Sequence, residues 1–160
     1  MINNDVIRSI RYILDVSEFK LVEIAMMGGG NTTQAKMNAY MKAEEEPGFE
    51  ACPQNLMARF LNGLIIFKRG KDESRPALAP DLPTNNVVLK KLRVAFELKD
   101  DDILNMLESV GFRITKSELS ALFRKEGHVN YRPCGDQLLR NFLKALTNRE
   151  KEKNHEKRKR

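Results

Sequence analysis

The chain has 160 residues, of which 41% are hydrophobic and 31% charged, as in an ordinary globular protein. No apolar run approaches the roughly 18 residues of a membrane span, and the first residues lack the basic and apolar regions of a signal peptide. Together with only two cysteines, this predicts a cytoplasmic protein with reduced thiols and no membrane segment.

The net charge of +6 is unevenly spread along the chain. Residues 3–64 carry a net charge of −2, residues 65–84 carry +1, residues 85–146 carry +3 and the remaining C-terminal residues carry +4. Most of the positive excess therefore lies at the C-terminus, and elsewhere the basic character leans toward the second half.

Residues 3–64 repeat at an offset of 82 residues. A gapless alignment with residues 85–146 has thirteen identical positions, where chance gives about four. The shared positions include Asn3/Asn85, Asn4/Asn86, Arg11/Arg93, Gly29/Gly111, Thr33/Thr115, Cys52/Cys134 and Phe60/Phe142. Two copies are fewer than the three or so that stabilise a solenoid. We therefore expect an all-α protein whose two tandem four-helix repeats pack with pseudo-twofold symmetry in one compact unit.

The first predicted helix of each copy follows Asn4 or Asn86, whose short side chain suits an N-cap. The second helix runs from about Glu18 to Met27 and from about Asp101 to Ser109, and glycines end both copies. The third helix begins at Thr33 or Thr115, and the Thr115–Glu118 spacing predicts a capping box.

The fourth helix carries the strongest amphipathic pattern. It is preceded by Cys52 or Cys134, and Pro53 suits its first turn, so both cysteines are predicted near helix N-termini. Leucines, a methionine and a phenylalanine recur at helical spacing in the first copy: Leu56, Met57, Phe60, Leu61 and Leu64.

These patterns divide the chain into four segments. Residues 1–69 form repeat 1, residues 70–84 a Pro-containing extended connector, residues 85–147 repeat 2 and residues 148–160 a basic tail. Three prolines and the lack of periodicity exclude a helix from the connector. The tail is expected to fray from the last helix and then to be disordered, because a run of charges cannot form a core.

Arg11 and Arg93 are the sharpest candidate ligand residues. Each lies four residues after one apolar core position and three before another, so each guanidinium starts on the core-facing stripe of its helix. One interpretation is a structural ion pair with a carboxylate or bonds to helix-end carbonyls. The other is a pair of phosphate sites, which the planar donors of arginine favour.

A second candidate is a basic stretch around the connector. Lys68, Arg69, Lys71 and Arg75 end the fourth helix and open the connector, while Lys90 and Lys91 are expected on the outer face of the next helix. They form either a patch for a phosphate backbone or an ordinary solvated surface, which Asp72 and Glu73 interrupt.

No cofactor or metal site is predicted. Cys52 and Cys134 could be reactive thiolates at helix N-termini, but repeat 1 has no histidine to act as a base, so buried structural thiols are favoured. The cysteines and histidines form no zinc-ligand set. The Gly28–Thr32 segment lacks the spacing of a phosphate loop.

Four strings in the sequence resemble those of the YehS-like family of small bacterial proteins. They are Phe60-Leu61-Asn62-Gly63-Leu64-Ile65, Lys68-Arg69-Gly70-Lys71-Asp72-Glu73, Asn85-Asn86-Val87-Val88-Leu89-Lys90-Lys91-Leu92-Arg93 and Cys134-Gly135-Asp136-Gln137-Leu138-Leu139-Arg140. The resemblance implies a cytosolic, duplicated protein of uncharacterised activity, and it carries over no catalytic or ligand residues.

The sequence thus favours a non-catalytic helical binding module. Its partner is expected to be RNA or DNA, bound through basic residues of the connector and repeat 2. The alternative is a protein adaptor that accepts a partner in an apolar groove between the repeats. A cysteine-based enzyme is a third interpretation. The sequence leaves the oligomeric state open.

Overall fold

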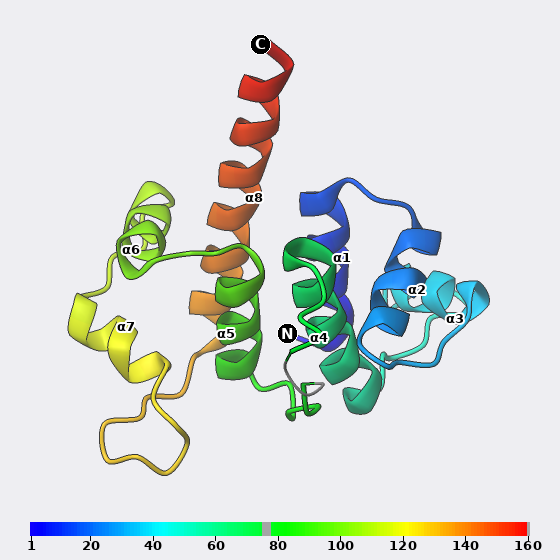
Figure 1. Cartoon of the computed structure of the whole chain (residues 1–160), viewed down its shortest axis with the longest axis horizontal. Helices are drawn as coiled ribbons and strands as arrows, with labels where there is room; N and C mark the ends of the chain where they lie inside the picture. Colours follow the sequence, from blue (N-terminus) through cyan, green and yellow to red (C-terminus); the bar gives the residue numbers. More distant parts are fainter. Residues whose placement is uncertain (75–77, 160) are drawn as a thin grey trace. The chain divides into compact units, whose positions relative to one another are not determined.

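The computed structural model describes residues 1–74 and 78–159, and in these residues the protein is entirely helical, without strands (Figure 1). This confirms the predicted all-α class. The eight helices of the described residues are α1 (Asn3–Leu14), α2 (Glu18–Met27), α3 (Gln34–Met41), α4 (Gln54–Arg69), α5 (Asn85–Ala95), α6 (Asp100–Ser109), α7 (Lys116–Leu122) and α8 (Asp136–Lys159). None of these helices is long and apolar enough to cross a membrane.

The N-caps of α3 and α7 lie where the sequence predicts them. The hydroxyl of Thr33 accepts from the amide of Lys36, and that of Thr115 accepts from the amide of Glu118. The Glu118 carboxylate accepts from the Thr115 amide in return, which completes the predicted capping box. Helices at equivalent positions of the two repeats therefore begin with the same local chemistry.

The predicted caps of α1 and α5 are wrong. The N-cap residues are Ile2 and Thr84, so Asn4 and Asn86 lie inside the first turn. The side chain of Asn4 is instead buried, with 1% of the residue exposed. Its amide donates to the carbonyls of Tyr40 and Glu50 at 3.0 and 2.8 Å, and its oxygen accepts from the Cys52 amide at 2.9 Å. Asn4 therefore ties α1 to the chain that enters α4.

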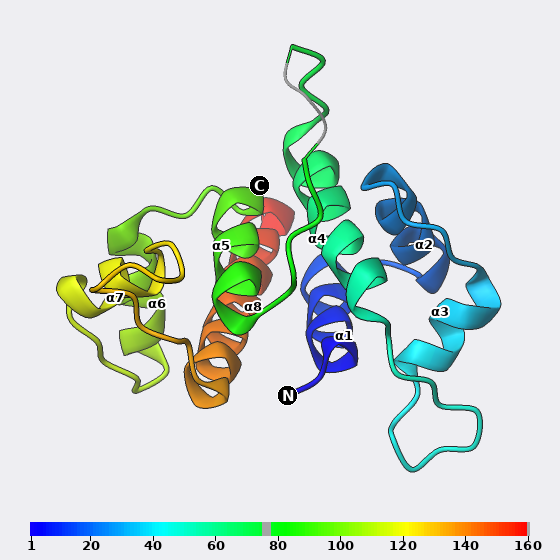
Figure 2. The same ribbon diagram turned by 90° about the horizontal axis from the view of Figure 1, so that it is seen from below.

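The protein divides into two compact units, Met1–Phe96 and Glu97–Arg160. The first contains α1 to α5, and in it α2 packs against α4 while α3 packs against α2 (Figure 2). Glycines allow the close crossing of α2 and α4: a Cβ atom on Gly63 would lie 1.8 Å from the Ile24 carbonyl oxygen, and one on Gly28 would lie 1.8 Å from that of Arg59. Any side chain at these two positions would separate the helices.

The second unit contains α6, α7 and α8. Its buried apolar side chains come from all three helices and include Ile103, Met106, Leu107, Leu119, Leu122, Leu139, Phe142 and Leu146. The unit boundary falls after α5, whereas the sequence repeat begins with α5. The difference arises because α5 packs against α4. The predicted pseudo-twofold packing of the repeats stays a prediction.

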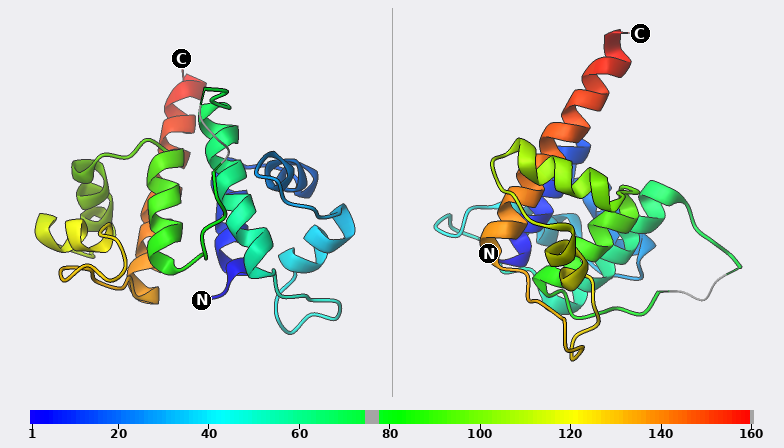
Figure 3. Two further views of the ribbon diagram at one scale, coloured as in Figure 1. Left: turned by 60° about the horizontal axis from the view of Figure 1, so that its bottom comes forward. Right: turned by 90° about the vertical axis from the view of Figure 1, so that its left-hand side faces the viewer.

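The charged tail does not fray. Helix α8 continues to Lys159, and this part of it extends beyond α6 and α7 (Figure 3). At its base Arg149 lies 3.8 Å from the carboxylate of Asp102 on α6, and Lys153 pairs with Glu150 one turn away. The predicted disorder of residues 148–159 is therefore wrong, because oppositely charged side chains three residues apart, such as Glu150 and Lys153, support the helix. The described part of the connector, residues 70–74 and 78–84, contains no helix, as predicted.

Candidate functional site

Arg11 forms a structural ion pair at the end of α1. Its Nε donates to the Val16 carbonyl at 3.3 Å, and its Nη1 lies 3.1 Å from Oε1 of Glu18 at the start of α2. These contacts close the turn between the two helices, so they support the structural interpretation rather than a phosphate site. Arg93 lies half-buried in the last turn of α5. The two arginines thus keep equivalent positions, each in the last turn of the first helix of its repeat.

Three of the predicted basic residues lie exposed on α4 and α5. Lys68 and Arg69 end α4, where the negative end of the helix dipole favours cations. The Nζ of Lys68 lies 4.8 Å above the ring of Phe96, at the end of α5. Lys90 is exposed in the middle of α5. The structure therefore places cations on two helices that pack against each other.

Beyond α4 the basic stretch loses its continuity. Lys71 is exposed, and its Nζ lies 3.7 Å from the carboxylate of Glu73, which offsets its charge. Arg75, also counted in the predicted stretch, lies outside the described residues. Lys71 therefore contributes little net charge to a basic surface.

Lys91 does not lie on the outer face of α5, and that prediction is wrong. Only 7% of the residue is exposed, because it follows Val88 by three residues and precedes Ala95 by four, on the buried stripe of the helix. Its Nζ donates to Oδ1 of Asn62 on α4 at 2.7 Å and lies 3.4 Å from Oδ2 of Asp81 in the connector. The spacing to Val88 and Ala95 is the signal in the sequence that was missed.

Asn62, Lys91 and Asp81 form a polar cluster that we call the connector clamp. While Oδ1 of Asn62 accepts from Lys91, its Nδ2 donates to the backbone carbonyls of Leu78 and Ala79 at 3.4 and 3.1 Å. Asn62 itself is 2% exposed. The clamp thus joins α4, α5 and the end of the connector. Lys91, the one buried lysine of the described residues, therefore has a structural role.

The two cysteines are buried, with thiol pKa values raised well above neutral pH. Burial raises the pKa of the Cys52 thiol to about 12 and that of Cys134 to about 11, and neither residue is more than 6% exposed. A helix N-terminus would lower a thiol pKa, but here desolvation dominates. The described residues contain no group of three or more potential metal ligands. The burial and raised pKa values support the interpretation of both cysteines as buried structural thiols.

The second unit contains a polar hollow that no motif in the sequence predicts. It has a volume of about 560 Å³, and residues of α7 and of the loop before α8 line most of it. The lining includes the cations Lys116, Arg124 and Arg132 and the neutral donors Ser117, Ser120 and Asn130, with Asp100 and Glu118 as the acidic members.

One ion pair beside this hollow occurs in both repeats with its acidic and basic residues in swapped positions. Arg132 donates to Glu118 in the second unit, and 82 residues earlier Lys36 pairs with Glu50 at 3.1 Å in the first. The acidic residue lies on the helix in one copy and after the loop in the other. Hydrogen bonds from Arg132 and from Thr115 lower the pKa of Glu118. Comparison of the two copies at this offset was the signal that could have revealed the pair.

A family model described as a protein of unknown function (DUF1456) matches the chain twice, over residues 3–70 and 85–151. The chain belongs to the DUF1456 family. The uncharacterized protein YehS of Escherichia coli (strain K12) is 48% identical over 151 residues, which cover 94% of this chain and 97% of that protein. The duplication and the predicted YehS-like resemblance are thereby confirmed. No solved structure matches the chain significantly.

Proposed function

We propose that this DUF1456 protein is a non-catalytic module that binds nucleic acid through α4 and α5. One observation carries the proposal: Lys90, Arg93 and Phe96 follow one another at three-residue spacing along α5, and Lys68 of α4 lies over the end of this row. Side chains three residues apart are neighbours on a helix surface. We call Lys68, Arg69, Lys90 and Arg93 the basic row.

The connector clamp supports this proposal indirectly. Because Asn62 and Lys91 join α4 to α5 inside the unit, the cations outside it have a fixed spacing. A fixed spacing reduces the ordering entropy that binding must overcome. Lysine and arginine side chains on such a surface contact phosphates rather than base edges. We therefore expect the protein to bind nucleic acid without strong sequence preference.

The test is fluorescence anisotropy with labelled single-stranded RNA and duplex DNA over a range of salt concentrations. The variant Lys68→Glu/Arg69→Glu/Lys90→Glu should bind at least about tenfold more weakly at low salt. Its log–log salt slope should fall by about one for each phosphate that the variant can no longer neutralise. Lys91 is not mutated, because it is buried.

A matched control reverses three exposed cations of the second unit, Arg113→Glu/Lys125→Glu/Lys144→Glu, with the same change in net charge. Its affinity should remain within about threefold of the natural chain. The proposal is refuted if the natural chain has no affinity for either nucleic acid at low salt, or if both triple variants lose it equally.

A protein adaptor is the second candidate, and the exposed side of α2 favours it. Phe19, Met26 and Met27 are 56%, 61% and 41% exposed, and their spacing puts them on neighbouring positions of one face. A contiguous group of exposed large apolar side chains is a feature of surfaces that contact other proteins. If Phe19→Asn/Met26→Gln abolishes a nuclease-resistant complex from lysate while nucleic acid binding is absent, the adaptor replaces the first proposal. The cytoplasmic location stays a prediction.

A further inference from the structure

The hollow on the second unit contains more hydrogen-bond donors than its own carboxylates use. The cationic groups come from Lys116 on α7 and from Arg124 and Arg132 in the loop that follows it. The side chains of Ser117, Ser120 and Asn130 add neutral donors. The hollow has a volume of about 560 Å³ and is open to solvent, so these groups are accessible to a small ligand. Its size and chemistry therefore fit a small, oxygen-rich anion.

The charges that line the hollow are not all available to a ligand. Arg132 is already paired with Glu118, and the lowered pKa of that carboxyl group keeps it ionised near neutral pH. Asp100 is the remaining acidic group of the lining. The other groups are Lys116 and Arg124, together with the hydroxyl groups of Ser117 and Ser120. Among the described residues, no hydrogen bond or ion pair engages these four side chains.

At the equivalent position in the first unit, the polar side chains are engaged by hydrogen bonds within the unit. Asn38, which aligns with Ser120, donates to Glu18 at 3.1 Å, and Lys42, which aligns with Arg124, donates to the Pro47 carbonyl at 3.1 Å. In the second unit the shorter Ser120 replaces Asn38. The side chains at these two positions donate hydrogen bonds within the first unit, whereas Ser120 and Arg124 are exposed to solvent in the second.

We propose that the hollow formed by α7 and the following loop binds a phosphate group, with Lys116 and Arg124 as the charged contacts and Ser117 and Ser120 as neutral donors. Arginine suits this role because its planar donors can bind two phosphate oxygens at once. The phosphate belongs either to a free nucleotide or to a nucleic acid strand. The site lies in the second unit and does not depend on the basic row.

The experiment is a titration of the full-length protein, labelled with 15N, with inorganic phosphate at constant ionic strength. The amide signals of Ser117, Ser120 and Arg124 should shift and saturate with a dissociation constant in the millimolar range or below. Arg124→Glu should weaken binding by about tenfold or more, as expected for the loss of one charge-assisted hydrogen bond. Lys116→Glu is a second variant with the same expected loss.

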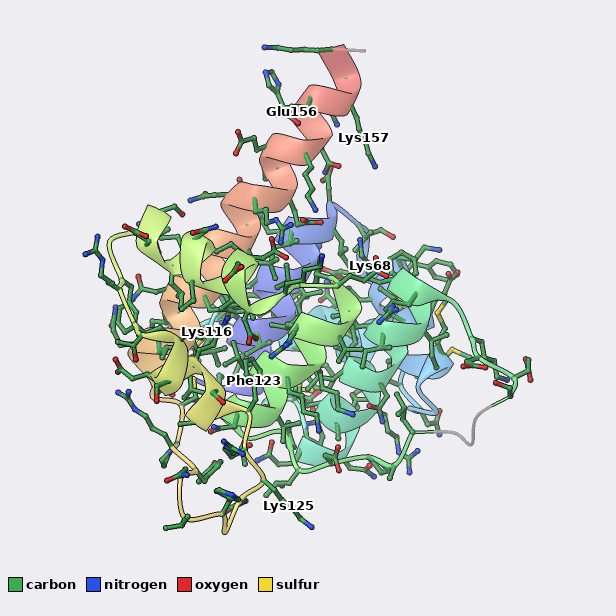
Figure 4. The ribbon with its side chains drawn as sticks, turned by 60° about the vertical axis from the view of Figure 1, so that its left-hand side comes forward. Lys68, Lys116, Phe123, Lys125, Glu156 and Lys157 are labelled. Atoms are coloured by element: carbon green, nitrogen blue, oxygen red, sulfur yellow. The ribbon has the colours of Figure 1, made fainter. Side chains whose placement is uncertain are left out.

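Lys125→Glu is the matched control, since it makes the same charge change one residue further along. Lys116 lies at the start of α7, while Lys125 extends from the loop away from that helix (Figure 4). The control should stay within about twofold of the natural chain. An equal loss in Lys125→Glu and Arg124→Glu, or no saturating shift at these amides, would overturn the proposal.

Two further arms identify the source of the phosphate. Adenosine monophosphate that binds at least about tenfold more tightly than inorganic phosphate indicates a free nucleotide, whereas a tighter fit for a short oligonucleotide indicates a strand. Both results support the site. The basic-row variant should bind inorganic phosphate normally, so failure of the proposed function and failure of this site are distinguishable.

Discussion

Removing the ammonium group of Lys91 should destabilise the first unit. In Lys91→Met the side chain keeps most of its length and volume, but Oδ1 of Asn62 loses its 2.7 Å donor. Asn62 is 2% exposed, so water cannot readily replace that donor. A buried acceptor left without a partner costs about 1–3 kcal/mol. We therefore expect the free energy of unfolding to fall by that amount.

The companion change, Asn62→Leu, should cost more, about 2–4 kcal/mol, because it leaves a buried charge with Asp81 alone and also removes the donor to the connector carbonyls. In the double variant Asn62→Leu/Lys91→Met both partners become apolar together. The double variant should lose less free energy of unfolding than the two single variants lose in sum. The difference, which is the coupling energy between the two residues, should be about 1 kcal/mol or more.

Urea denaturation followed by circular dichroism measures these differences, and hydrogen exchange assigns them to a unit. Exchange should accelerate in α4 and α5 and remain unchanged in α6 to α8. Lys90→Met is the control, because this neighbouring lysine is exposed and its replacement should change stability by less than about 0.5 kcal/mol. If Lys91→Met were as stable as Lys90→Met, the clamp would not contribute to folding and the reasoning would be wrong.

Three further predictions concern packing, thiol chemistry and the exchanged ion pair. Gly63→Ala should lower the free energy of unfolding by about 1–3 kcal/mol despite the better helix propensity of alanine, since its Cβ would overlap a carbonyl oxygen of α2. Cys52 and Cys134 should react with iodoacetamide at pH 8 at least about tenfold more slowly than a free thiol, because burial raises both pKa values and leaves little thiolate. Lys36→Glu/Glu50→Lys should be folded and within about 1 kcal/mol of the natural chain, because the second unit already uses the reversed pair.

Each of these predictions has a result that would contradict it. Unchanged stability in Gly63→Ala would show that α2 and α4 can separate freely. Rapid alkylation of the folded protein, with full reactivity in urea as the reference rate, would show that the thiols are accessible. For the ion pair, the single variant Glu50→Lys serves as the comparison. If the double variant were less stable than this single variant, the acidic and basic residues could not be swapped between the two positions.

Local pattern was sufficient for the features that depend on neighbouring residues. The capping box at Thr115 was predictable because both of its hydrogen bonds lie within one turn. The cap predicted at Asn4 failed because its side chain binds three groups more than thirty residues away. Residue type alone cannot tell a local acceptor from a buried link, since the same amide serves both.

The candidate site shows the same division. The exposure of Lys68, Arg69 and Lys90 follows from the sequence, because each lies outside the apolar stripe of its helix. Lys91 lies on that stripe and was misplaced, since a charged side chain was expected outside. Only the position of Asn62 on α4 explains how the lysine can be buried.

The sequence by itself determined the all-α class, the duplication and most helix boundaries, because helical spacing and caps are properties of a few consecutive residues. The tertiary structure decided which polar side chains are engaged inside the protein and which remain exposed. Lys91 is engaged by Asn62, whereas Arg124 faces a hollow. That distinction depends on contacts between distant segments, and such contacts satisfy hydrogen bonds that no local pattern can count.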